Sequence, residues 1–423
     1  MALPFKRGSA YCRFLSKKNK VRSERDLSEK KENKISIHCI LACIYFLALP
    51  LTIWTNSYGA SLLKLITIPI GGYFLASFVF YKKEFEINLV HLLLVIYTIS
   101  TLLTLFIDRS TESIEFVIGY FLNAAIYICM TVVSYNEREL EFFENTQIAV
   151  LALITGWVLY SNSLYYERTT LVIFGQVSDP NYFVGYFIFP LVVTMKKIVH
   201  SKYRVLYLLL MALSLYVVFQ SGSRGGFVSV LITIAAFALI YPEKTKFKIW
   251  LLLVGIGFFA LLWNVLSPML PDKVLERMSV DAVIESRGTH RFDIWVSALN
   301  QIKNSSWELI FGRGINAMHT MIIAGTETPA VIHNQFIQVI YSQGVIGFVT
   351  FFALTGAAFM RCIKRRKIVS IAIIGMLALA VSLTFNQTTR TFWNIIAYSA
   401  LVFPRQNEDV KYKEESKNEE MED

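Results

Sequence analysis

Long runs of hydrophobic residues, separated by short polar connections, fill the chain from residue 36 to residue 403. Because a membrane-spanning helix needs about 20 mostly apolar residues, the pattern predicts about twelve transmembrane helices. The predicted spans are 36–54, 60–81, 87–107, 114–134, 147–161, 181–199, 203–220, 226–241, 247–266, 336–360, 368–385 and 391–403. The fold class that follows is an all-α, polytopic membrane protein.

Lysine and arginine alternate between the two sides of these predicted spans. If the N-terminal tail is cytoplasmic, it carries 11 of them and the inner loops carry 15, whereas the short outer loops carry four. Those four are Arg109, Arg168, Arg224 and Arg390. Since positive charge gathers on the cytoplasmic side of membrane proteins, the bias predicts an even number of spans with both termini in the cytoplasm.

The composition agrees with a membrane protein and excludes a soluble enzyme. Only 17% of the 423 residues are charged, against about 25% in a soluble domain. Three segments, 1–35, 267–335 and 404–423, hold 40 of the 72 charged residues. The first is predicted to be a basic cytoplasmic tail and the last an acidic one, flanking a transmembrane domain at 36–403. The net charge of +10 forms no single basic patch, so no nucleic-acid partner is expected.

Residues 267–335 form the longest connection, and the predicted topology places it outside the cytoplasm, between the ninth and tenth spans. A long loop in an otherwise short-looped bundle is typically functional. Within it, apolar residues recur at the spacing of one helix face: Phe292, Trp295, Val296, Leu299 and Ile302. This spacing predicts an amphipathic helix, which either lies on the membrane surface or packs within a small outer subdomain.

Three arginines on the predicted outer side are candidates for phosphate contacts. Arg224 lies in the glycine-rich turn 221–226, where backbone amides and a guanidinium suit phosphate oxygens. The alternative is an arginine that reaches from a helix end to the membrane interface. Arg291 begins the amphipathic helix, either as a phosphate contact or as a solvated, ion-paired charge. Arg313 lies between two glycines at a loop turn, a weaker signal.

His333 is the histidine best placed for chemistry, because it closes the outer loop just before the tenth span. The positive end of a helix lowers a histidine's pKa and attracts anions. A neutral imidazole there would accept a proton from a sugar hydroxyl, whereas the alternative is a capping or interfacial histidine. Asp179 and Asn181 flank Pro180 before the sixth span. They signal a helix start, with a sugar or phosphate contact as an added role.

The sequence lacks the signatures of several other classes. The predicted spans contain few ionisable side chains, whereas ion-coupled transporters place such residues near mid-membrane. The chain has no nucleotide-binding glycine motif, no Ser-His-Asp signature and no HExxH. The spacing of His290, His319 and His333 matches no metal motif, so neither a metal nor another cofactor is expected.

Several motifs together resemble the bacterial O-antigen polymerase and O-antigen ligase superfamily. They occur in the order and topology of that family, and the resemblance covers about residues 175–360. The motifs are Asp179-Pro180-Asn181, Ser223-Arg224-Gly225, Arg291 with Ile294-Trp295, and Gly312-Arg313-Gly314 followed by His333-Asn334.

The resemblance implies a metal-independent glycosyltransferase on the outer face of the bacterial cytoplasmic membrane, with an undecaprenyl-pyrophosphate-linked oligosaccharide as donor. It implies that Arg224 and Arg291 engage the pyrophosphate and that His333 is the base for the acceptor hydroxyl. Because His290 precedes Arg291, the choice between the two histidines stays open. Substrate contacts are expected from Ser223, Gly225, Asp179, Asn181, His290, Arg313, Asn334 and Trp295.

The expected function is that of a polysaccharide polymerase, which transfers a growing glycan from undecaprenyl pyrophosphate to the next lipid-linked repeat unit. One alternative within the family is an O-antigen ligase, which moves the finished chain to a lipid A core or other acceptor. An alternative of another class is a glycolipid flippase or transporter. Besides the lipid bilayer, the expected partners are a chain-length regulator and a flippase of the same pathway.

Overall fold

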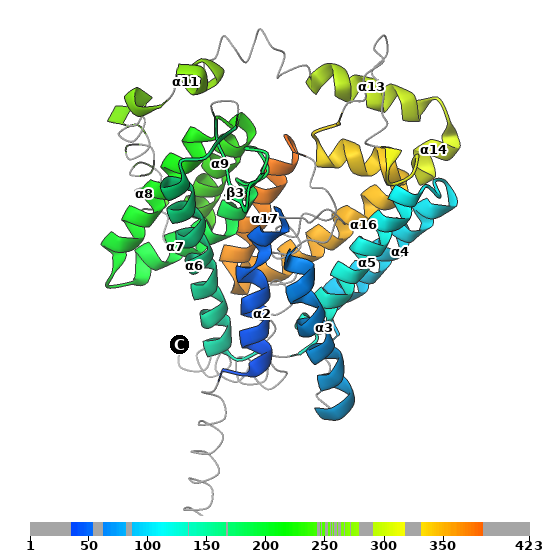
Figure 1. Cartoon of the computed structure of the whole chain (residues 1–423), viewed down its shortest axis with the longest axis horizontal. Helices are drawn as coiled ribbons and strands as arrows, with labels where there is room; N and C mark the ends of the chain where they lie inside the picture. The colour runs from blue at the N-terminus through cyan, green and yellow to red at the C-terminus, as the bar shows by residue number, and fades with distance from the viewer. Residues whose placement is uncertain are drawn as a thin grey trace, which may run out of the picture.

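The computed structural model is built almost entirely from α-helices within the part of the chain that it describes (Figure 1). It describes residues 35–53, 62–81, 87–133, 135–165, 168–242, 267–270, 272–278, 291–317 and 331–383, with scattered positions between 246 and 265. The two tails, His290 and the predicted span 391–403 lie outside the described residues.

Five of the described helices are long and apolar enough to cross a membrane, and four more are apolar but shorter. The five are α3 (Leu62–Tyr81), α4 (Leu89–Leu103) with η2 (Thr104–Phe106), α5 (Thr111–Thr131), α6 (Glu137–Ser161) and α16 (Gln335–Arg365). The four are α2 (Ile37–Leu47), α8 (Arg204–Gln220), α9 (Arg224–Ile240) and α17 (Lys367–Ala380). The remaining helices are η1 (Leu49–Ile53), α7 (Gly185–His200), η3 (Ser267–Met269), α11 (Asp272–Met278), α13 (Arg291–Lys303) and α14 (Ser306–Phe311).

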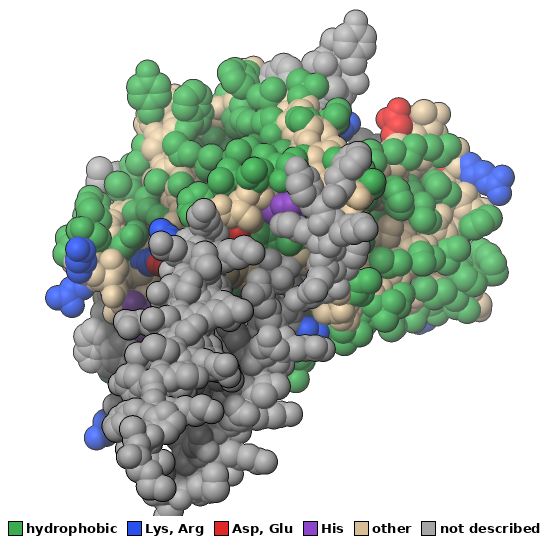
Figure 2. All heavy atoms as spheres, turned by 90° about the horizontal axis from the view of Figure 1, so that it is seen from below, with side chains coloured by type: hydrophobic (Ala, Val, Ile, Leu, Met, Phe, Trp, Pro, Cys, Tyr) green, Lys and Arg blue, Asp and Glu red, His purple; other side chains and the backbone are tan. Residues whose placement is uncertain are grey.

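The outward faces of these helices are apolar. Ile68, Val79 and Val205 are each more than 70% exposed, and Figure 2 shows hydrophobic side chains over most of the described surface that it views. So much exposed apolar area would be unfavourable in water and is stable against lipid. The expectation of an all-α membrane protein is thus confirmed, while the count of twelve spans and the placement of the loops stay predictions.

The centre of the bundle is α17, which packs against α7, α9 and α16. Glycines permit the closest of these approaches. A Cβ added at Gly375 of α17 would lie 2.0 Å from Thr233 Oγ1 of α9, and one at Gly225 of α9 would lie 2.4 Å from the Cβ of Ser382. Small residues at such crossings let two helix backbones come together, as is common between membrane helices.

The start of α6 differs from the sequence expectation, which began this span at residue 147. The helix begins at Glu137 because Asn136 and Glu139 form a capping box. The Glu139 N–H donates to Asn136 Oδ1 at 2.9 Å, and the Asn136 N–H donates to Glu139 Oε2 at 2.9 Å. Charged residues near the start of this helix hid it from a search for apolar runs.

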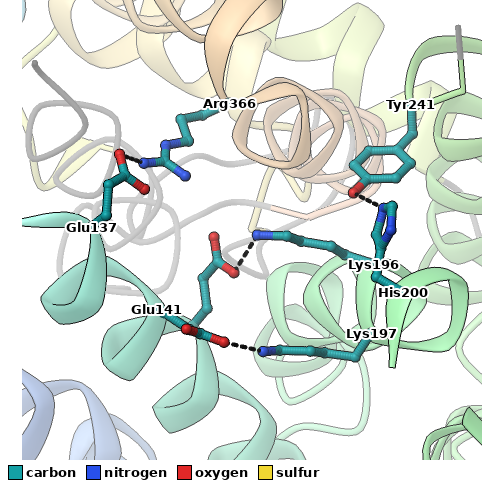
Figure 3. Close-up of polar contacts among 8 residues, drawn as sticks. Glu137, Glu141, Lys196, Lys197, His200, Tyr241 and Arg366 are labelled. Carbon is teal, nitrogen blue, oxygen red and sulfur yellow. Dashed lines mark hydrogen bonds and ion pairs between the residues drawn. The ribbon is translucent and has the colours of Figure 1, made fainter. Parts of the chain in front are cut away.

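Ion pairs compensate those charges at what we call the ion-pair end of the bundle (Figure 3). Lys196 of α7 contacts Glu144 at 2.6 Å, and that carboxylate side chain is only 1% exposed. The other pairs join Lys197 to Glu141 at 2.9 Å and Arg366 to Glu137. The carboxylates of α6 are therefore held by cations from α7 and from the α16–α17 junction.

Helix α16 is broken at Gly344, whose φ of 65° and ψ of −165° are not helical. The break frees the carbonyls of Tyr341 and Ser342, which accept the backbone N–H groups of Arg313 at 3.0 Å and Gly314 at 3.1 Å. A Cβ at Gly344 would lie 2.3 Å from a backbone oxygen of α14. The turn that follows α14 thus fills the break, and the close approach requires glycine.

The predicted amphipathic helix exists as α13, which lies across the end of the bundle (Figure 1). Its buried apolar side chains, Ile294, Ala298 and Ile302, pack with Ile332 and Tyr341. Part of the predicted apolar stripe stays exposed: Phe292 by 60%, Val296 by 41% and Leu299 by 42%. Each of the two predicted alternatives therefore fits one face of α13. One face packs on the protein, and the other is an apolar surface of the kind that lies on a membrane.

Two short antiparallel hairpins between α6 and α7 are an addition to the all-α expectation. The first pairs β1 (Leu164–Tyr165) with β2 (Arg168–Thr169), and the second pairs β3 (Val172–Ile173) with β4 (Gln176–Val177). The first hairpin places Arg168 beside the turn that joins α8 to α9.

Candidate functional site

The site begins with the loop before α7, where Asp179 fixes Asn181. Asp179 Oδ1 accepts the backbone N–H of Asn181 at 2.6 Å and its side-chain Nδ2 at 2.8 Å. Asn181 Oδ1 then accepts Arg168 Nη2 at 3.1 Å, while Arg168 Nε donates to the carbonyl of Ser221 at 2.7 Å. Arg168 is only 9% exposed. Burial and the nearby charge of Arg277 lower the pKa of Arg168 to about 10.

The turn from Ser221 to Gly226 is shaped by its own side chains. Gly222 has a φ of 56°, a left-handed conformation that favours glycine. Ser223 caps α9, because its buried Oγ accepts the N–H of Gly226 at 3.2 Å. Arg224 is the first residue of α9, and Gly225 packs directly against Ser382. Helix capping and close packing therefore account for Ser223 and Gly225, and Arg224 stands at the positive end of the helix dipole.

Arg291, the first residue of α13, ties that helix to the end of α17. Its Nη1 donates to the carbonyl of Ser382 at 2.6 Å. Burial lowers the pKa of Arg291, whereas the charge of Asp179 raises it; Arg277 and Arg224 lower it further. An arginine with a lowered pKa remains protonated at neutral pH. Arg291 thus keeps a positive charge in a largely buried position.

His333 lies one residue before the N-cap of α16. Its φ of 49° is in the left-handed region, and Asn334 caps the helix by accepting the N–H groups of Phe336 at 3.0 Å and Ile337 at 3.2 Å. Burial lowers the pKa of His333, the charge of Arg291 lowers it further, and Asp179 opposes both. Its Nδ1 is buried and has no hydrogen-bond partner among the described residues. The imidazole is therefore neutral near pH 7.

These residues form one group, which we call the Arg–His cluster: Arg168, Asp179, Arg224, Arg277, Arg291 and His333. The members come from five segments of the chain. They are close enough for their charges to shift the pKa values of Arg168, Arg291 and His333. The cluster holds four guanidiniums and one carboxylate. Three helices begin at it: α9 and α13 start at cluster residues, and α16 starts two residues after His333. Positive charge and positive helix ends together make a site for an anion.

Two residues that were expected to contact substrate, Trp295 and Arg313, make contacts within the protein instead. Trp295 donates its Nε1 to the carbonyl of Ile332 at 2.8 Å, so it fixes the backbone beside His333. Arg313 lies apart from the cluster, where its Nη1 donates to Gln301 Oε1 at 2.9 Å and contacts the Tyr341 hydroxyl at 3.3 Å.

The sequence reasoning missed three contributors to the cluster: Arg168, Arg277 and Ser382. Arg168 was one of four arginines in short outer loops, and Arg277 lies in the long loop; treating every outer-side arginine as a candidate would have found both. Ser382 contributes its backbone carbonyl, which any residue type carries, so no sequence signal marks it.

Fold and site together define an α-helical integral membrane protein with a cationic, histidine-containing site at one end of its bundle. Residues 209–352 match a family model described as O-antigen ligase. This segment contains Arg224, Arg277, Arg291 and His333.

A curated relative gives an independent comparison. The chain is 24% identical, over 209 residues, to the teichuronic acid biosynthesis protein TuaE of Bacillus subtilis (strain 168). The aligned part covers 46% of this chain and 42% of the relative, so the match spans less than half of the relative's length. The two matches confirm the resemblance to the O-antigen ligase and polymerase superfamily.

Proposed function

We propose that this protein is a glycan polymerase of the cell envelope, which transfers a glycan from a polyprenyl pyrophosphate to the hydroxyl of a lipid-linked repeat unit. The observation that supports it most directly is the convergence of four arginines, one histidine and three helix starts in the Arg–His cluster. A diphosphate leaving group carries the negative charge that such a site stabilises.

On the donor side, the arginines of the cluster differ in role. Arg168 and Arg291 are held by backbone carbonyls, at 2.7 Å from Ser221 and 2.6 Å from Ser382, so their guanidiniums are fixed before substrate binds. Fixed donors stabilise developing charge without reorganising during the reaction. Arg224, the first residue of α9, adds a charge at the positive end of that helix dipole.

On the acceptor side, His333 is the candidate base. A neutral imidazole takes the proton of the acceptor hydroxyl as its oxygen bonds to the anomeric carbon of the donor sugar. The bond from that carbon to the phosphate oxygen breaks, and the pyrophosphate leaves with the electron pair. The lowered pKa of His333 keeps the base in its neutral form. His290, outside the described residues, stays the alternative base.

The proposed orientation places the Arg–His cluster outside the cytoplasm. Helix α7 begins a few residues after Asn181 of the cluster network and ends near Lys196 and Lys197, about 18 Å further along its axis. The ion-pair end carries these lysines and Arg366. Positive charge of this kind favours the cytoplasmic side. Metal independence and the pathway partners stay predictions.

Deleting the gene in its native host separates polymerase from ligase. A polymerase deletion accumulates single lipid-linked repeat units, whereas a ligase deletion accumulates long lipid-linked chains. The description of the matched family favours the ligase as the second candidate, and TuaE is by its name a protein of teichuronic acid biosynthesis.

Point variants test the site itself. In complemented deletion cells, Arg291→Ala and Arg224→Ala should each abolish polymer while the protein remains in the membrane. Arg204→Ala removes an exposed arginine at the start of α8 and is the matched control, with wild-type polymer expected. Wild-type polymer from both cluster variants would refute the proposed function.

A further inference from the structure

A second polar site lies at the end of α13 remote from Arg291, in a pocket of about 730 Å³. The pocket is bounded by the α4–α5 connection, by α13, by the turn after α14 and by the first segment of α16. Its polar lining consists of Asp108, Ser110, Gln301, Arg313, Asn316 and Tyr341. Pockets that bind small molecules have volumes of about 300–1,000 Å³, so the space is large enough for a sugar.

Three of the lining residues are held in place by hydrogen bonds to one another. Gln301 Oε1 accepts Arg313 Nη1 at 2.9 Å and the Tyr341 hydroxyl at 2.8 Å. The Arg313 guanidinium also lies 5.6 Å from the centre of the Tyr341 ring, and its Nε is 3.6 Å from Glu308 Oε2. The charge of Arg313 is thus already balanced, and its position is set by the protein.

The α4–α5 connection supplies an acceptor to the pocket lining. Asp108 accepts the N–H of Ser110 at 2.9 Å and the hydroxyl of Ser113 at 2.5 Å. Burial raises the pKa of Asp108, but these hydrogen bonds outweigh it and the net pKa is lowered, so the carboxylate is charged at neutral pH. Asn316 forms no side-chain hydrogen bond within the described part of the chain, and its amide has both a donor and an acceptor to offer.

This chemistry differs from that of the Arg–His cluster. The cluster has a large excess of positive charge, whereas the pocket pairs Arg313 with Glu308 and adds the carboxylate of Asp108. A phosphate would be repelled by Asp108, and a lipid tail would leave the polar lining without partners. Sugar hydroxyls both donate and accept, so they match a mixed lining of amide, carboxylate and guanidinium groups.

Two helices lead from the cluster to the pocket. Along α13, Arg291 and Gln301 are separated by about 15 Å, and along the first segment of α16, Asn334 and Tyr341 are separated by about 10 Å. The two helices pack through one apolar cluster that includes Ile294 and Tyr341. Reaction site and pocket are therefore rigidly spaced, at a distance that a short oligosaccharide spans.

We propose that this pocket is a glycan subsite, which binds a sugar residue of the lipid-linked oligosaccharide a short distance from the bond that reacts at His333. The proposal rests on the function proposed above and extends it. Binding there would hold the glycan in register while the pyrophosphate occupies the Arg–His cluster.

The test measures glycan transfer in membranes that contain the full chain, with lipid-linked repeat units extracted from the deletion strain as the probe. Asn316→Ala should raise KM for these units about five- to tenfold with kcat little changed, the factor that one lost hydrogen bond is worth. Asn316→Asp, which keeps the side-chain volume and removes the amide donor, should raise KM as well. Asn300→Ala, an exposed amide one position before Gln301, is the matched control, with wild-type KM expected.

The outcomes separate this proposal from the proposed function. If both Asn316 variants keep wild-type KM while Arg291→Ala abolishes transfer, the pocket is not a glycan subsite and the function stands. If Arg291→Ala and Arg224→Ala both transfer glycan at the wild-type rate, the proposed function fails. A fall in kcat at unchanged KM for both Asn316 variants would overturn the subsite too, because it would indicate a structural effect.

Discussion

The contact between Gly225 and Ser382 gives a quantitative test of how helix packing supports the Arg–His cluster. A Cβ at position 225 would lie 1.8 Å from Ser382 Oγ and 2.4 Å from Ser382 Cβ. The hydroxyl can rotate away, but the Cβ cannot, and carbon atoms rest at about 3.5–4.0 Å. Gly225→Ala therefore forces a backbone shift of roughly 1 Å, and overpacking of this kind costs about 1–3 kcal/mol.

The same shift reaches the site through Arg291. Its Nη1 donates to the Ser382 carbonyl at 2.6 Å, and a displacement of roughly 1 Å is enough to take that distance beyond hydrogen-bonding range. We expect Gly225→Ala to lower both the thermal stability of the detergent-solubilised protein and the polymer yield of complemented cells. Thermal stability is measured by fluorescence-detected gel filtration after heating, and polymer by gel electrophoresis.

A second substitution makes the test specific. Ser382→Gly removes the clashing Cβ and keeps the carbonyl, so the Gly225→Ala/Ser382→Gly double variant should regain most of the stability and polymer. Gly156→Ala in α6 is the control, because its Cβ would meet nothing within 4 Å and alanine is favoured in helices. The packing argument is wrong if Gly225→Ala behaves as wild type, or if Ser382→Gly leaves its defect unchanged.

Four further predictions follow from the same structure. His333→Asn, whose asparagine tolerates the left-handed backbone, should lower glycan transfer by about 10²–10⁴-fold with unchanged folding. Because burial lowers the pKa of His333, the acid limb of the wild-type pH–rate profile should lie below about pH 6.5, and a limb at or above that value contradicts the assignment. Lys196→Met removes the cation that contacts the buried Glu144 at 2.6 Å and should cost about 3 kcal/mol in unfolding free energy, most of it regained when Glu144→Gln is added. Equal melting of the single variant and wild type would count against this. Arg168→Lys should reduce polymer about tenfold, because a lysine ammonium cannot reach both acceptors that the guanidinium contacts. A normal polymer yield would contradict this prediction.

The membrane class and most helices were predictable because lipid exposure requires long apolar runs. The start of α6 was not predictable, because Glu139 and Glu144 interrupt the apolar pattern. Glu139 belongs to the capping box of the helix, and Glu144 pairs with Lys196 of another helix. The hydrophobic pattern shows neither contact. The break in α16 was missed for a similar reason. Gly344 looks like any glycine in an apolar run until its contact with α14 is known.

For the site, residue type and position selected Arg224, Arg291, Asp179 and His333, because guanidiniums, carboxylates and imidazoles are rare in an apolar chain. Residue type could not show that Arg313 belongs to a different place. Only the tertiary structure separates it from the cluster, through its contacts with Gln301 and Tyr341.

The sequence by itself determined that the chain is a bundle of apolar helices with a charged loop between two of them, because the hydrophobic pattern and the scarcity of charge act locally. The tertiary structure decided which charges meet. Arg168 on a hairpin, Arg277 on α11 and the Ser382 carbonyl after α17 join Arg291 only when the helices pack. Electrostatic and hydrogen-bond interactions act only between groups that are close in space. The packing of α9 against α17 at glycines brings these groups together, and no single segment of the sequence specifies that packing.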